Sequence, residues 1–200
     1  MLLRMTNVTL SLSILVKRID WGNFEGFFTT GIPTFVLISL LFFCVIIITI
    51  GLLSNRIVNK SRFIIRVLFI EYLLLILLST IVCRGAQSFD YARLELVPFW
   101  TYRAVLDNVP GVSVWDIILN VLLFIPLGLF TKALFPNTTL IRMVIISVIC
   151  SVFIETNQYL FEKGIAQIDD VLHNALGGII GWFIAGLLLN IQAKYRRKNK

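Results

Sequence analysis

The sequence of 200 residues has little charge, few cysteines and a single histidine. Charged residues make up 14% of the chain and hydrophobic residues 58%, a balance that excludes an ordinary soluble domain. Cys44, Cys83 and Cys150 form neither a CxxC pair nor a zinc-ligand spacing, and a lone His173 excludes a multi-histidine metal site. The HExxH, GxSxG and Walker A motifs are also absent. We therefore expect no metal and no cofactor, and an enzyme is the less favoured interpretation.

Long apolar runs are the main feature that is present. Each approaches the ~20 residues needed to cross a bilayer, and we place spans at 33–53, 63–83, 116–134, 140–160 and 170–190. Residues 1–32 hold a shorter apolar run followed by basic and aromatic residues, which predicts an interfacial segment. The sequence therefore predicts an all-α, polytopic transmembrane bundle of about five spans.

The distribution of Lys and Arg predicts how the bundle is oriented. If the basic tail at 191–200 is cytoplasmic, eleven Lys and Arg lie in inner segments and seven in outer ones, which favours an outer N-terminus. Six spans with an inner N-terminus is the alternative. We expect a multi-pass protein of a bacterial plasma membrane with a cytoplasmic C-terminus. Because topology accounts for the net charge of +7, no nucleic-acid partner is expected.

This orientation places ten of the eleven carboxylates at or near the outer face. Glu155 and Gln158 lie one helical turn apart near the end of the fourth span, with Ser151 beneath them. Asp170 and Asn174 share a face at the start of the last span, and the short linker makes the two helices antiparallel neighbours. Close carboxylates require a shared proton, a cation or a nearby basic side chain. Two interpretations of this cluster remain open: a ligand pocket, and a polar clamp that only locks the helices of the bundle together.

The start of the last span combines polar and small residues. Asp169 and Asp170 are placed to cap free backbone N–H groups, a role that suffices for Asp169. His173 is positioned to form a hydrogen bond with Asp170. Below them lies a small-residue stripe that lets another helix pack closely, made of Gly177, Gly181 and Ala185.

The third span and the segment before it supply the other candidates. Asn120 points to the same outer region as the acidic cluster. Residues 84–115 contain a short apolar stretch with Pro98, which predicts a re-entrant or interfacial element over that cluster. Three arginines of this segment are candidates to bind an anionic group such as phosphate or to reach lipid headgroups: Arg84, Arg93 and Arg103. Glu71, inside the second span, either pairs with Arg66 or a neighbouring helix or contacts a proton or substrate.

Four stretches together resemble the VanZ-like family of bacterial membrane proteins. They are Leu94–Phe99, Asn120–Gly128, Glu155-x-x-Gln158, and Ile168-Asp169-Asp170 followed by Asn174–Gly178. Their order and spacing assign residues 84–190 to a VanZ-like domain with three spans and leave the two spans of 33–83 outside the resemblance. The family's motif residues fall on Asn120, Glu155, Gln158, Asp170 and Asn174.

The resemblance implies a role in lowering susceptibility to teicoplanin-type glycopeptides. The leading interpretation is an outward-facing polar pocket that binds a lipid-linked cell-wall precursor, another cell-envelope ligand or the glycopeptide, with membrane lipids as neighbours. One alternative is an intramembrane enzyme that acts on a lipid head group with Glu155 and Asp170 as an acid/base pair. Another is a scaffold in which the polar cluster only joins helices. The oligomeric state is open.

Overall fold

The computed structural model describes residues 47, 59–82, 93–110 and 112–199. Four helices of this part are long and apolar enough to cross a membrane: α4 (Lys60–Leu77, continued by the π-helical η1, Leu78–Val82), α6 (Val114–Leu134), α7 (Leu140–Leu160) and α8 (Ile168–Lys198). An all-α polytopic bundle is thus confirmed, with its spans close to the predicted ranges. Apart from Ile47, the predicted span at 33–53 lies outside the described residues, as do segment 1–32 and Arg84.

Side-chain caps fix where the helices begin. Asn59 and Thr139 accept hydrogen bonds from the first-turn amides of α4 and α7. At α6, the Ser113 hydroxyl accepts from Trp115 N at 3.1 Å, while the Asp116 carboxylate accepts from Ser113 N at 2.6 Å. Such reciprocal capping satisfies amides that have no partner within the helix. Asp116 therefore contributes to the start of α6.

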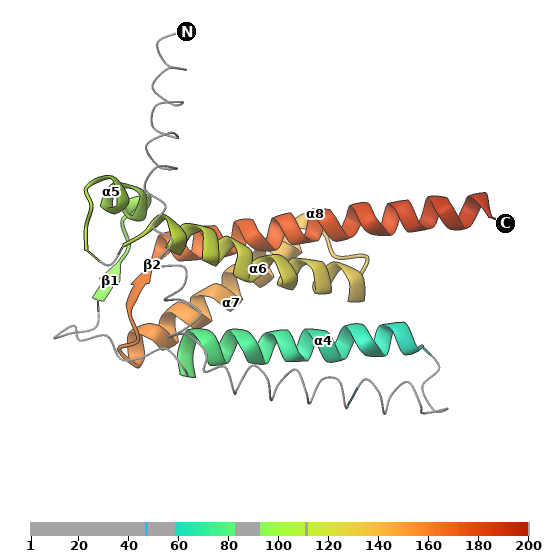
Figure 1. The fold of residues 1–200 in the computed structure, drawn as a ribbon, viewed down its shortest axis with the longest axis horizontal. Helices are drawn as coiled ribbons and strands as arrows, with labels where there is room; N and C mark the ends of the chain where they lie inside the picture. The colour runs from blue at the N-terminus through green and yellow to red at the C-terminus, as the bar shows by residue number, and fades with distance from the viewer. Residues whose placement is uncertain (1–46, 48–58, 83–92, 111, 200) are drawn as a thin grey trace, which may run out of the picture.

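α8 is longer than the apolar run that predicts it. It has 31 residues and continues through Lys198, so the basic residues of 191–198 lie on the same helix. Figure 1 shows that the C-terminal part of α8 extends past the other helices at one end of the bundle. The charged extension follows directly from the apolar span without a break in the helix.

Glycines bring α8 into backbone contact with its neighbours. A Cβ atom added at Gly177 would overlap Val121 O of α6, and one at Gly181 would overlap Ile125 O. A Cβ at Gly178 would overlap the Ser147 hydroxyl of α7. Ala185, the last small residue of the stripe, is buried. Because helices without side chains at the contact approach most closely, these residues set the spacing of α8.

Two short strands and a short helix close one end of the bundle. β1 (Arg93–Glu95) pairs in parallel with β2 (Ile165–Gln167), with Leu94 opposite Ala166. α5 (Trp100–Leu106) follows β1. Figure 1 shows β1, β2 and α5 together at the end opposite the C-terminus, here called the α5 end. The predicted interfacial element is thus a strand, a turn and a helix, and three-residue strands carry no periodicity that would predict them.

A small apolar core lies between α4, α6 and α7. Its buried residues are Tyr72, Ile76, Phe124, Leu127, Met143 and Ile154. The Tyr72 hydroxyl donates to Leu123 O at 2.6 Å, which ties α4 to α6. Glu71, beside it, is buried, and its Oε1 atom has no hydrogen-bond partner in the part of the chain that the structure describes. Among the described residues no ion pair joins Glu71 to Arg66, so this one of the alternatives left open for Glu71 is excluded.

Candidate functional site

Asp169 anchors the segment that closes the α5 end. Its carboxylate accepts hydrogen bonds from Phe99 N at 2.6 Å and Thr101 N at 2.8 Å, and the residue is 1% exposed. These amides lie at the start of α5, where backbone N–H groups have no partner within the helix. The expectation that Asp169 only caps its own helix is therefore wrong: Gln167 is the N-cap of α8 and makes no side-chain cap bond.

A second contact fixes the same segment. The Thr101 hydroxyl donates to Gln167 Oε1 at 2.8 Å, directly beside the β1–β2 pair. Phe99, just before α5, has a φ of 64°, a left-handed conformation that costs energy for an aromatic residue. The Asp169 bond to Phe99 N holds this residue in place, so the carboxylate determines the geometry of the turn.

His173 lies one turn further along α8 and contacts α5. The Tyr102 hydroxyl is 2.9 Å from His173 Nε2, whereas His173 Nδ1 is 4.0 Å from Asp170 Oδ1. The latter distance is too long for a hydrogen bond, so the expected His173–Asp170 bond is wrong. Burial, and then the negative charge of Asp169, raise the pKa of Tyr102. The Tyr102 phenol therefore remains protonated over the physiological pH range.

The two polar groups predicted on α7 and α8 are connected across the helix pair. Glu155 Oε2 accepts from Gln167 N at 3.0 Å, and Asn174 Nδ2 donates to Ser151 Oγ at 2.8 Å. Gln158 Nε2 donates to Thr80 O at 3.2 Å and so links α7 to η1. Glu155, Gln158 and Asn174 are all buried. The structure thus gathers these side chains at the α5 end, where their hydrogen bonds join four elements: α7, α8, β2 and η1.

Three buried side-chain atoms of this cluster have no hydrogen-bond partner among the described residues. They are Gln158 Oε1, Asn174 Oδ1 and His173 Nδ1. A buried polar atom without a partner costs about 1–3 kcal/mol, so a cluster of three is expensive to keep for packing alone. Hydrogen-bonding positions at these three atoms are thus left unused by the described residues.

The remaining candidates occupy the surroundings of the cluster. Asn120 is half-buried on α6, and Asp170 is half-buried on α8. Arg103 is exposed on α5, and Arg93 pairs through its backbone with Ile165 in the strand pair. Within the described ranges, no group of three or more His, Cys, Asp or Glu side chains is arranged to hold a metal ion.

Comparison with known families identifies the family of the chain. The family model described as VanZ/LLP1 matches residues 35–189. The chain belongs to the VanZ/LLP1 family. The match begins well before residue 84, so the prediction that the two N-terminal spans lie outside the resemblance is wrong. The residues before 84 consist of apolar runs without polar motifs. Polar motifs alone therefore could not assign these residues to the family. No curated protein and no solved structure matches the chain.

Several residues of the site had no clear signal in the sequence. Thr101 and Tyr102 of α5 and Gln167 of β2 are ordinary polar residues, and only the fold brings them together at the start of α8. The sequence indicates Asp170 as the candidate site residue of the adjacent pair Asp169 and Asp170. In the structure, however, Asp169 is the more deeply buried of the two carboxylates.

Proposed function

We propose that this VanZ/LLP1 membrane protein lowers susceptibility to teicoplanin-type glycopeptides. It does so by binding a lipid-linked or other cell-envelope ligand at the polar cluster of the α5 end, which faces outward. The observation that carries the proposal is a set of buried polar atoms on Gln158, His173 and Asn174 that have no partner among the described residues. These atoms lie beside the carboxylates that hold the closing segment in place.

The chemistry of the cluster favours a neutral or hydrogen-bond-donating group of the ligand. The side-chain amide oxygens of Gln158 and Asn174 are acceptors, and Glu155 adds a carboxylate nearby. Arg103, exposed on α5, is available for an anionic group at the surface. Such an arrangement suits a ligand with sugar or peptide hydroxyl and amide groups next to a phosphate.

The experiment compares teicoplanin and vancomycin susceptibility in a sensitive Gram-positive host. The host expresses wild type, Glu155→Gln, Asp170→Asn or the control Glu162→Gln at matched membrane levels. Glu162 is an exposed carboxylate just after α7, so its substitution leaves the cluster intact. We expect wild type and Glu162→Gln to raise teicoplanin tolerance, and both cluster variants to lose the effect.

Two results contradict the proposal. The first is unchanged tolerance in the strain that expresses wild type. The second is full tolerance in Glu155→Gln and Asp170→Asn. Loss of tolerance together with a lower melting temperature of the purified variants would instead support the scaffold, since the polar cluster would then act by joining helices.

A further inference from the structure

A cavity opens beside the polar cluster, next to the strand pair. Its volume is about 220 Å³, and its walls come from β1, α7, β2 and the first turn of α8. The apolar part of the wall consists mainly of Leu94, Leu96, Val152, Ile168 and Val171. Glu155 and Gln167 contribute the polar part. We call this cavity the α7 groove.

The α7 groove continues a lipid-facing stripe of α7. Apolar side chains recur every three or four residues along one exposed face of this helix, at Ile141, Ile145, Ile149 and Val152. The next position on that face, Thr156, lies in the groove wall. Leu94 and Leu96, two residues apart in the β1 segment, extend the apolar surface on the other side. A hydrocarbon chain lying along α7 in the membrane therefore leads directly into the groove.

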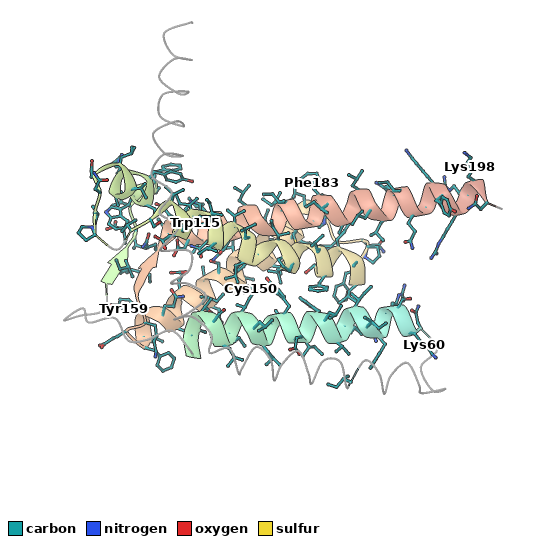
Figure 2. The ribbon with its side chains drawn as sticks, viewed as in Figure 1. Lys60, Trp115, Cys150, Tyr159, Phe183 and Lys198 are labelled. Carbon is teal, nitrogen blue, oxygen red and sulfur yellow. The ribbon has the colours of Figure 1, made fainter. Side chains whose placement is uncertain are left out.

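The dimensions suit one chain. Lining residues run from Val152 to Tyr159, a distance of about 10 Å at 1.5 Å per residue. Pockets that enclose drug-sized ligands measure roughly 300–1,000 Å³, so 220 Å³ is too small for such a ligand or for a helix. Figure 2 shows that Tyr159 lies at the end of the bundle opposite Lys198. The groove therefore runs inward along α7 from one membrane face.

We propose that the α7 groove binds a single hydrocarbon chain of a membrane lipid from the leaflet at the α5 end. Hydrogen bonds of the polar wall connect the groove to the neighbouring polar cluster and to α5. Glu155 accepts a hydrogen bond from Gln167 N, and Gln167 in turn accepts from Thr101 of α5. A chain packed against Ile168 and Leu94 buries the side of β1 and β2 that is otherwise open to the membrane. Occupancy of the groove thereby stabilises the strand pair and the segment that closes the α5 end.

The test uses purified full-length protein in phosphatidylglycerol vesicles doped with a phosphatidylglycerol that carries a diazirine on one acyl chain. After irradiation, mass spectrometry of the digested protein locates the labelled peptides. We expect labelling concentrated in 152–171, and its loss in Val152→Trp, which fills the groove from an exposed position. If the indole of Val152→Trp displaces about two methylene groups of the bound chain, the occupancy of the groove falls about tenfold.

The matched control is Ile145→Trp. Ile145 is exposed on the same stripe, but it does not line the groove. This variant should retain the labelling of 152–171. Equal labelling along the whole stripe, or labelling of 152–171 that Val152→Trp leaves unchanged, overturns the proposal, because the lipid then contacts α7 only as bulk solvent.

A second variant covers the case in which Val152→Trp does not fold. Leu96→Trp fills the groove from the β1 side and should give the same loss, again with Ile145→Trp as control. Native mass spectrometry of wild type purified in mild detergent adds a separate readout: we expect one co-purified phospholipid per chain, and its absence contradicts the proposal. Neither readout depends on glycopeptide tolerance, so failure of the proposed function leaves this test intact.

Discussion

Replacement of Gly181 by alanine tests whether backbone contact between α6 and α8 holds the bundle together. The new methyl group would overlap Ile125 O and lie 2.9 Å from Leu129 N. Both neighbours are backbone atoms of α6, so the contact is relieved only if the helices separate. Overpacking of this kind costs about 1–3 kcal/mol. The gain in helix propensity from glycine to alanine, about 1 kcal/mol, offsets only part of a cost near the upper end of that range.

Gly186 provides the control on the same helix. A Cβ atom there meets only the Lys132 side chain at 3.9 Å, an ordinary van der Waals contact. Gly186→Ala should therefore be neutral or stabilising by up to about 1 kcal/mol. For a chain of this size 1 kcal/mol shifts the melting temperature by about 2–4 °C.

The assay is thermal unfolding in mild detergent, followed by the helical circular dichroism signal. We expect Gly181→Ala to melt several degrees below Gly186→Ala. The reasoning is refuted if the two variants melt together, since α8 would then tolerate a side chain at the α6 contact.

Two further predictions concern the α5 end. Asp169→Asn weakens the bonds to Phe99 N and Thr101 N, each about 1.5–3 kcal/mol for a charged acceptor, so amide exchange in 97–106 should speed up at least about tenfold. Hydrogen-exchange mass spectrometry checks this against Asp107→Asn, an exposed carboxylate, and equal protection in both variants would contradict it. Because the pKa of Tyr102 is raised in the folded protein, its contribution to stability is complete below its ordinary value of 10.0 and declines as the pH rises above it. Melting temperatures measured from pH 7 to pH 11 should therefore fall less at the alkaline end for Tyr102→Phe than for wild type, and parallel curves would disprove the assignment.

The sequence predicts the helices well because hydrocarbon imposes a simple requirement. A run of about 20 apolar residues has few alternatives to a membrane helix, since backbone polar groups must be satisfied within the segment. The antiparallel arrangement of α7 and α8 follows from the short linker between them, and the Ser151–Asn174 bond agrees with it. The family could likewise be predicted from the sequence, because the order and spacing of the polar motifs are enough to show the resemblance.

The site is less predictable because long-range contacts determine it. Asp169 and Asp170 are chemically identical neighbours, and only the position of α5 decides that Asp169 receives two backbone amides. Tyr102 meets His173 across 71 residues of sequence, without a local pattern that marks either partner. The α7 groove depends on a strand pair of three residues on each side, too short for a periodic signal.

The most direct test of the account asks which face of the membrane the α5 end occupies. In a variant without the native cysteines, Asp107→Cys places a thiol at an exposed position just after α5, and Lys198→Cys places one at the far end of α8. Both are treated in intact cells with a membrane-impermeant maleimide, and again after permeabilisation. The account predicts that Asp107→Cys is labelled in intact cells and Lys198→Cys only after permeabilisation. The reverse pattern would place the polar cluster at the cytoplasmic face and contradict an outward-facing ligand site.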